Sequence, residues 1–207
     1  MRHGQSENNI DPMVGDWQNP GLTPLGREQA QAVALRLANE LSGKDFVVYS
    51  SHLKRAHETA QTICSELCVD PIVDEMLQEY QTRLDPGLSR PDAEQYKLSE
   101  ITPAKNWRTF RGAESLGELF QRAGEVLSRI SDLHNEIVVI VCHGWIIDKM
   151  IAWWMGIELD NIRANMFTTA NASISVLSVT QFGERVLLKL NDTTHLTHFK
   201  DKDSYLG

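Results

Sequence analysis

The first nine residues of the chain bring together side chains that suit phosphate chemistry. They read Met1-Arg2-His3-Gly4-Gln5-Ser6-Glu7-Asn8-Asn9. The guanidinium of Arg2 is a planar fork of N–H donors that matches a phosphate group, and a neutral His3 has a ring nitrogen that can attack phosphorus. Gly4 would let the backbone approach a ligand closely, while Ser6 and Asn9 add neutral hydrogen-bond donors. This pattern predicts a site that binds phosphoryl groups.

Two later segments carry further candidate phosphate ligands, and the prediction depends on them because three-residue matches arise by chance. Arg55 lies in Ser51-His52-Leu53-Lys54-Arg55-Ala56, and His143 lies in Val141-Cys142-His143-Gly144. Each segment follows a short apolar stretch, at residues 46–49 and 137–142 respectively. Ligands of parallel sheets bind beyond the carboxyl ends of the strands. Arg55 and His143 are therefore expected at the same rim of a sheet.

The periodicity of the chain predicts the elements that must position these residues. Helices are expected over residues 24–41, 54–67, 116–133 and 145–155. Strands are expected over residues 46–49, 71–73 and 137–142, and a hairpin over 173–179 and 185–190. The apolar run 137–142 is typical of a central strand that is covered on both faces. The predicted fold class is α/β, a three-layer sandwich with a mostly parallel sheet, helices on both faces and a C-terminal antiparallel hairpin.

Residues 80–113 are polar and contain Pro86, Gly87, Pro91 and Pro103, with a weak helical signal around residues 92–101. We interpret this segment as a cap inserted over the active site of a single domain that spans residues 1–207. Its arginines would either reach a distal charge on a substrate or pair with nearby acids. These arginines are Arg83, Arg90, Arg108 and Arg111.

The bulk composition narrows the function classes. With 20 basic and 28 acidic side chains the net charge is −8, which argues against a general nucleic-acid or anionic-membrane surface. Cys64 and Cys68 are four residues apart in a helical stretch and are expected in the core, and no zinc-binding motif appears. No signal peptide or membrane-spanning apolar run is evident, so a reduced, cytoplasmic compartment is expected.

Taken together, the motifs resemble the histidine phosphatase superfamily, also called the phosphoglycerate-mutase-like family. The resemblance covers most of the chain except residues 80–113. The matching segments are Arg2-His3-Gly4-Gln5-Ser6, Gly21-Leu22-Thr23-Pro24-Leu25-Gly26, Tyr49-Ser50-Ser51, Arg55-Ala56-His57-Glu58-Thr59-Ala60, Leu77-Gln78-Glu79, Glu114-Ser115, Cys142-His143-Gly144 and Asn171-Ala172-Ser173.

The resemblance implies an enzyme in which His3 is the nucleophile that becomes phosphorylated. Arg2, Arg55 and His143 would hold the phosphoryl oxygens, and Glu79 would protonate the leaving oxygen and then activate water. No metal or other cofactor is required in this scheme, because two guanidiniums and an imidazolium balance the charge of the phosphoryl group.

Further site residues follow from the resemblance and from residue type. Glu75 lies one turn before Glu79, so either carboxyl group remains a candidate for the proton donor. Gly144 is expected where the backbone approaches the ligand, and Asn171 is expected to help to hold the site. The secondary phosphate contacts are expected to be Ser6, Asn9, Gly21 and Thr23.

The predicted function is a metal-independent phosphomonoester hydrolase that acts on a small phosphorylated metabolite through a phosphohistidine. The alternatives are mutase-type phosphoryl transfer and a catalytically silent module that binds a phosphorylated ligand. Hydrolysis is favoured because the chain lacks the fuller pattern of the cofactor-dependent mutases between His3 and Leu22. It also has no Arg-Arg pair followed by a proline run. The sequence does not name the substrate, and Trp153-Trp154 fits a homodimer interface as well as a core.

In the family, the Arg-His-Gly triplet ends a short apolar strand beside the strand matched here by residues 137–142. Only Met1 precedes Arg2 in this sequence, so about five strand residues are absent. We therefore expect the first strand to be truncated, and a β-branched segment to precede Met1 in the full-length protein.

Overall fold

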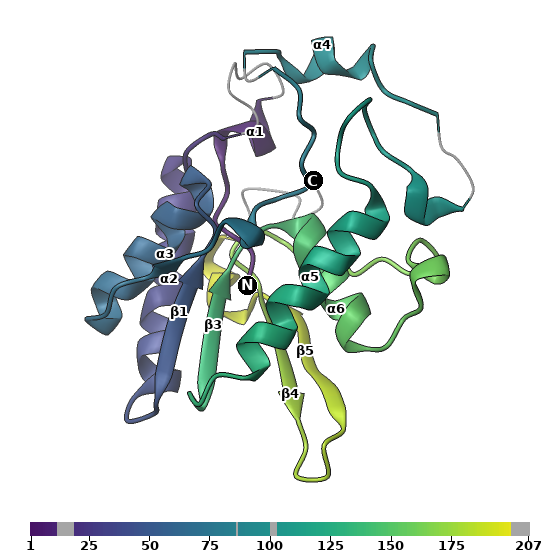
Figure 1. Cartoon of the computed structure of the whole chain (residues 1–207). Coiled ribbons are helices and arrows are strands. Elements are labelled where there is room, and N and C mark those ends of the chain that lie inside the picture. Colours follow the sequence, from purple (N-terminus) through teal and green to yellow (C-terminus); the bar gives the residue numbers. More distant parts are fainter. Residues whose placement is uncertain (12–18, 86, 100–102, 200–207) are drawn as a thin grey trace.

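The computed structural model describes residues 1–11, 19–85, 87–99 and 103–199 (Figure 1). A parallel sheet has the strand order β2-β1-β3, and an antiparallel hairpin pairs β4 with β5. The strands are β1 (Phe46–Ser50), β2 (Ile72–Val73), β3 (Ile137–Val141), β4 (Ile174–Val179) and β5 (Arg185–Asp192). The expected α/β fold with a C-terminal antiparallel hairpin is confirmed.

Helices cover both faces of the parallel sheet (Figure 1). The long helices are α2 (Pro24–Leu41), α3 (Lys54–Leu67), α5 (Leu116–Ser131) and α6 (Gly144–Trp154). The short ones are α1 (Glu7–Ile10) and α4 (Arg90–Glu94), with 3₁₀ turns at Glu75–Leu77, Ala104–Asn106, Leu159–Asn161 and Thr194–Phe199. Among the described residues, no helix has the length and hydrophobicity needed to cross a membrane.

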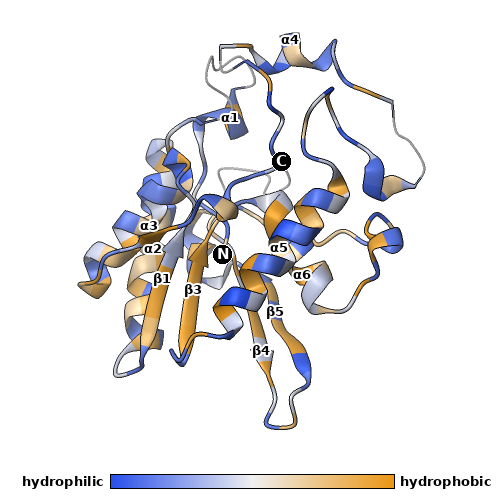
Figure 2. Ribbon diagram, viewed as in Figure 1, coloured by the Kyte–Doolittle hydropathy of each residue, from blue (hydrophilic) through white to orange (hydrophobic). Residues whose placement is uncertain are grey.

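Successive residues of β1 and β3 point into two different cores, as the pleat of a strand requires. Val48, Val139 and Val141 pack with α2 and α3, whereas Tyr49 and Ile140 pack with α5 and α6. Figure 2 shows the hydrophobic strands β1 and β3 between these helical layers. The three-layer arrangement follows from this alternation, because each face of the sheet needs its own cover.

Local signals define where two of the long helices begin. The hydroxyl of Thr23 accepts a hydrogen bond from the backbone N–H of Gly26 at 2.9 Å, and Pro24 occupies the first helical position of α2. At α5, Ser115 and Glu118 form a reciprocal capping box, with backbone-to-side-chain distances of 2.8 and 3.1 Å. Thr23 and Ser115 each stand directly before an apolar helical period, so both helix starts have a signal in the sequence.

The structure differs from the sequence-based expectation in the cap segment. The helical signal around residues 92–101 corresponds to the five residues of α4, Arg90–Glu94, which Ser89 caps and which a turn follows. Residues 100–102 lie outside the described part of the chain. Pro91 at the start of α4 suits a first helical turn.

Strand β3 is less buried than its apolar run indicated. Residues 137–140 are half-buried, and only Val141 is fully buried. One edge of β3 pairs with β1 along its whole length. On the other edge, the described hydrogen bonds join residues 1–3 to residues 140–142, at the carboxyl end of the strand. Residues 137–139 therefore have fewer backbone partners on this edge, among the described residues, than the prediction of a central strand assumed.

The aromatic pair Trp153-Trp154 belongs to the packing of this chain. The Trp154 side chain is buried and its indole N–H donates to the carbonyl of Val186 at 3.2 Å. The guanidinium of Arg185 lies 4.4 Å from the centre of the Trp153 ring. The pair therefore gives no support to the homodimer interface, which stays an untested expectation.

Gly4 and Gly26 allow the first turn of α2 to lie directly against the N-terminal segment. A Cβ atom at Gly4 would be 2.4 Å from the carbonyl oxygen of Gly26, and one at Gly26 would be 1.9 Å from the carbonyl oxygen of Gln5. Both distances are impossible for real atoms without a shift of backbone. Helix packing therefore accounts for Gly4, which the sequence analysis had assigned to close approach of a ligand.

We predict that Gly26→Ala lowers the free energy of unfolding by about 1–3 kcal/mol through overpacking. This loss should exceed the gain of about 1 kcal/mol that alanine brings to a helix interior. Urea unfolding of the variant measures the change. Gly87→Ala is the control, because a Cβ there meets nothing within 4 Å. An unchanged midpoint for Gly26→Ala would contradict the packing argument.

Candidate active site

A cavity of about 810 Å³ contains most of the residues expected to bind phosphate. Arg2, His3, Arg55, Glu79 and Gly144 all line it. Arg55 is in the first turn of α3, just after β1, and Gly144 begins α6 just after β3. Arg55 and Gly144 therefore meet at one rim, whereas His143, the residue named in the expectation, is fully buried and is not part of the cavity lining. The cavity is also lined by Asn8, Asn9, Tyr80, Arg83, Arg90, Trp107, Phe110, Trp145 and residues 166–169.

The His3 side chain is held in one tautomer. It is buried, with 3% of its surface exposed. Its Nδ1 atom lies 2.7 Å from the carbonyl oxygen of Gly4. A carbonyl oxygen can only accept, so Nδ1 carries the proton and Nε2 carries the lone pair. The Nε–H of Arg55 donates to this Nε2 at 3.1 Å. The Nε2 lone pair of His3 thus lies beside a guanidinium that also suits a phosphoryl oxygen.

Burial keeps His3 neutral. It is the largest cause that lowers the pKa of His3 well below 6.5, and the positive charges of Arg55 and Arg2 lower it further. The carbonyl of Gly4 opposes these effects by accepting from Nδ1. At neutral pH the ring is therefore uncharged, and Nε2 keeps the lone pair that a nucleophile needs.

His143 is fully buried behind His3, and the two ring centres are 5.1 Å apart. Its Nε2 shares a hydrogen bond of 2.9 Å with the hydroxyl of Ser51. Burial first, and then the charge of Arg55, lower the pKa of His143 well below 6.5. The imidazolium expected from the resemblance is therefore disfavoured in the site as it stands. Burial is the main reason, and the positive charges of Arg55 and Arg2 add to it.

Arg2 is anchored by its backbone and by one end of its guanidinium. Its Nη1 donates to the carbonyl of Thr169, and its backbone N–H donates to Ser173 at 3.2 Å. The buried Nε of Arg2 finds no hydrogen-bond partner among the described residues. Burial lowers the pKa of Arg2, and the charge of Glu79 partly offsets this effect. An anion in the cavity would satisfy both the charge and the donor.

The structure separates the two candidate proton donors. Glu79 is half-buried in the cavity wall, and its carboxylate accepts from the backbone N–H groups of Tyr80 at 3.0 Å and Trp145 at 3.1 Å. The second of these donors is in the first turn of α6, where unpaired N–H groups favour a carboxylate. Glu75, in the 3₁₀ turn Glu75–Leu77, is exposed and does not line the cavity. Glu79 is therefore the better candidate.

Asn9 and Asn171 lie together at the edge of the site. Asn9 lines the cavity. The amide of Asn171 donates to Asn9 Oδ1 at 3.1 Å and to the carbonyl oxygens of His3 and Gly4 at 3.4 Å each. Asn171 thus contacts the backbone that carries His3, while its expected role in holding the site stays a prediction. Gly144 lies beside Arg2, where a Cβ atom would be 3.7 Å from the guanidinium carbon, an ordinary contact distance.

Three expected phosphate contacts lie outside the cavity lining and have structural partners instead. Ser6 is fully buried, and its hydroxyl donates to Asn9 Oδ1 at 2.9 Å. Thr23 caps α2 and donates to Gln5 Oε1 at 2.8 Å. The carbonyl of Gly21 accepts from the N–H of Glu7 at 3.1 Å. These residues shape the N-terminal loop that carries His3.

The cap arginines divide into two groups. Arg83 and Arg90 line the cavity. Arg108 instead forms two hydrogen bonds of 2.7 Å to the carboxylate of Glu118, and Arg111 is exposed. Arg108 therefore has the acid-pairing role that was considered, while contact of Arg83 and Arg90 with a substrate stays a prediction.

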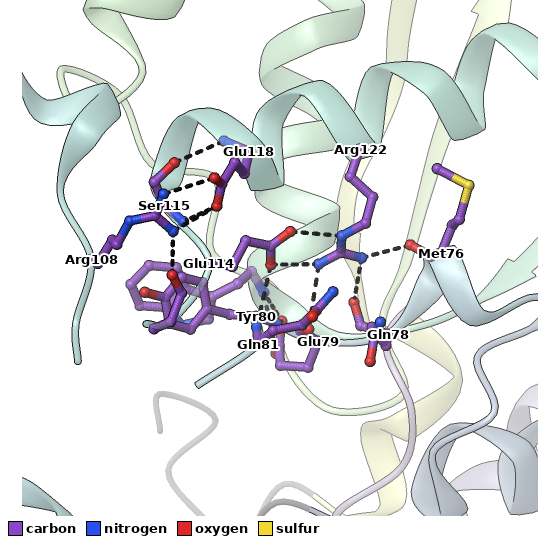
Figure 3. A network of polar contacts seen from close by, with 12 residues as sticks. Met76, Gln78, Glu79, Tyr80, Gln81, Arg108, Glu114, Ser115, Glu118 and Arg122 are labelled. Carbon is purple, nitrogen blue, oxygen red and sulfur yellow. Dashed lines mark hydrogen bonds and ion pairs between the residues drawn. The ribbon is translucent and has the colours of Figure 1, made fainter. Parts of the chain in front are cut away.

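Sequence reasoning missed Ser51 as a partner of His143, and it missed Arg122 altogether. Arg122 lies on α5 and contacts the backbone around Glu79 (Figure 3). One signal was present, because Arg122 interrupts the apolar face of α5 between Leu119 and Ala123. A charged residue at such a position needs buried partners.

Comparison with known proteins agrees with this geometry. Residues 1–193 match the histidine phosphatase superfamily (branch 1). The chain is 37% identical to phosphoglycerate mutase-like protein 4 of Arabidopsis thaliana over 158 residues, which are 72% of this chain and 67% of that protein. It is 30% identical to phosphoserine phosphatase 1 of Hydrogenobacter thermophilus over 208 aligned residues, covering 96% of this chain and 93% of that one.

A solved structure shows the same fold. Bacillus stearothermophilus YhfR superposes with a TM-score of 0.77 at 26% identity, covering 94% of this chain and 96% of that one. The family match over residues 1–193 and the structural match over 94% of the chain each extend over most of it. The chain therefore belongs to branch 1 of the histidine phosphatase superfamily and is a phosphoglycerate-mutase-like enzyme.

Proposed function

We propose that the chain is a metal-independent phosphomonoester hydrolase that acts on a small phosphorylated metabolite through a phosphohistidine at His3. The observation that carries this proposal is the state of His3. Its ring is neutral, Nδ1–H is fixed on the Gly4 carbonyl, and the Nε2 lone pair lies beside Arg55 at the cavity wall. A phosphomonoester dianion repels nucleophiles, and the charges of Arg2 and Arg55 would offset that repulsion.

In the first step Nε2 of His3 forms the bond to phosphorus while the bond to the ester oxygen breaks. Glu79 gives its proton to the departing oxygen. In the second step a water molecule attacks the phosphohistidine, Glu79 takes a proton from that water, and the N–P bond breaks. Inorganic phosphate leaves and His3 returns to its neutral form, so atoms and charges balance over the cycle.

His143 would take up a proton when the phosphorylated substrate binds. The dianion brings negative charge to a place where Arg2 and Arg55 had disfavoured a proton on the ring. Binding should therefore raise the pKa of His143 and let it donate toward a phosphoryl oxygen. The imidazolium implied by the family resemblance would form on ligand binding rather than before it.

The substrate class we favour is a phosphomonoester that also carries a carboxylate. The relative that matches nearly the whole chain is named phosphoserine phosphatase 1. Bisphosphoglycerate-dependent mutases of Brucella species match over 97 residues, or 45% of this chain. Arg83 and Arg90 line the cavity from residues 80–113, which we take as a cap on a single domain. Their charges would attract a distal carboxylate.

We predict that the enzyme releases phosphate from para-nitrophenyl phosphate and from phosphoserine in the presence of EDTA, and that His3→Ala abolishes both activities. Only His3 can form the covalent bond, because the other site residues only stabilise charge. Rapid-quench labelling measures acid-labile phosphate on the protein. A labelled His3→Ala variant would refute the nucleophile, and activity lost in EDTA would refute metal independence.

Glu79→Gln is expected to slow an alkyl phosphate such as glycerol 2-phosphate by roughly 10²–10⁴-fold, the usual value of general acid catalysis. Para-nitrophenyl phosphate should lose much less, because its leaving group needs little protonation. Steady-state kcat values on the two substrates test this. Glu75→Gln is the matched control, since Glu75 is exposed away from the cavity. Equal losses on both substrates would argue for a purely structural Glu79.

Binding of tungstate, which is a dianion at neutral pH, should be accompanied by uptake of up to about one proton per site. The pKa of His143 starts well below 6.5, so the ring is neutral before binding, and the dianion shifts it toward the protonated form. Calorimetry in two buffers with different ionisation enthalpies measures the uptake. His143→Asn should remove it. A binding enthalpy that is the same in both buffers would contradict proton uptake by His143.

A further inference from the structure

All three nitrogen atoms of the Arg122 guanidinium donate hydrogen bonds to Glu114 or to the backbone around Glu79. Its side chain is 10% exposed. Its Nε donates to Oε1 of Glu114 and its Nη2 donates to Oε2 of the same carboxylate, both at 2.8 Å. This bidentate pairing is the geometry that a guanidinium fork favours. Figure 3 shows Arg122 and Glu114 between α5 and the irregular segment that carries Glu79.

The remaining donors of Arg122 go to backbone carbonyls around Glu79. Nη1 donates to the carbonyls of Met76 at 2.6 Å and Gln78 at 2.8 Å, and Nη2 donates to that of Glu79 at 3.4 Å. With the two bonds to Glu114, these contacts occupy the five N–H donors of the guanidinium. A lysine has three donors on a single atom and would not reproduce this pattern.

Glu114 holds the other side of the same segment. Its side chain is 4% exposed. Its Oε2 accepts from the backbone N–H of Gln81 at 3.2 Å, and its own N–H donates to the carbonyl of Gln81 at 2.8 Å. Arg122 and Glu114 together, here termed the clamp, therefore fix the backbone on both sides of Glu79.

The segment needs such support because it lies outside regular structure. Residues 78–85 belong to no helix or strand, so no ladder of backbone hydrogen bonds fixes them. The clamp replaces that ladder with side-chain contacts. Because a guanidinium and a carboxylate are paired in it, it brings no net charge near Glu79.

We propose that Arg122 and Glu114 are positioning residues for the general acid, which hold the Glu79 backbone so that its carboxyl group reaches the leaving oxygen. This inference rests on the proposed role of Glu79. A displacement of a catalytic group by about 1 Å can lower the rate on the order of 10²-fold. Loosening the clamp should therefore weaken protonation of the leaving group while leaving attack by His3 intact.

The test compares leaving groups in Arg122→Lys and Glu114→Gln. In each variant, kcat on glycerol 2-phosphate should fall at least about tenfold more than kcat on para-nitrophenyl phosphate. KM should change little on either substrate. In a Glu79→Gln background, Arg122→Lys should add less than about twofold, because the group it positions is already gone. Thermal unfolding of every variant confirms that it is folded at the assay temperature.

Arg36→Lys is the matched control. The Arg36 side chain is 13% exposed and pairs with Asp192, away from the segment that carries Glu79. Any loss in this variant should be equal on both substrates. The nearly isosteric Glu114→Gln keeps the test available if Arg122→Lys does not fold.

Three results would overturn the inference. They are equal losses on both substrates in the clamp variants, a full multiplicative loss in the Glu79→Gln background, and failure of both clamp variants to fold, which would make the pair purely structural. The Glu79→Gln single variant distinguishes failure of the positioning inference from failure of the proposed acid role of Glu79. If that variant loses equally on both substrates, the acid assignment falls and the inference falls with it.

Discussion

The hydrogen bond from His3 Nδ1 to the carbonyl of Gly4 is the interaction on which the site depends. It selects the tautomer that leaves Nε2 with its lone pair, and it sets the direction in which the ring faces. The backbone around it is bonded on several sides. His3 N–H donates to Cys142, the His3 carbonyl accepts from Ala172, and Gly4 N–H donates to Thr59. These hydrogen bonds fix the backbone that carries His3 to three other parts of the chain.

The same site shows how burial and charge act together on histidine. His3 and His143 lie beside two guanidiniums and away from water, so both rings are driven toward the neutral form. For His3 this is what a nucleophile requires. For His143 it means that protonation depends on an incoming anion. The net charge of −8 does not prevent anion binding, because Arg2, Arg55, Arg83 and Arg90 converge on the cavity, where they outnumber the lining acids Glu79 and Glu94.

Much of the fold was predictable because its signals are local. The N-caps Thr23 and Ser115 and the apolar periods marked where helices begin, and the boundaries of α2 and α3 agree with the prediction. The position of Arg55 after β1 and of His143 after β3 followed from a general property of parallel sheets. Full burial of β3 was not predictable in this way, since it depends on the neighbour at its second edge rather than on its own residues.

By itself, the sequence determined the residue types, their order along the chain, and the strand ends after which Arg55 and His143 follow. Tertiary structure decided what the site residues do. It turned Glu79 into the cavity and Glu75 out of it. It gave Ser6 and Thr23 structural partners, made Gly4 a packing contact, and brought Arg122 against the backbone of Glu79. The physical reason is that protonation, exposure and hydrogen-bond partners depend on groups that are distant in sequence, and only the folded chain places those groups in contact.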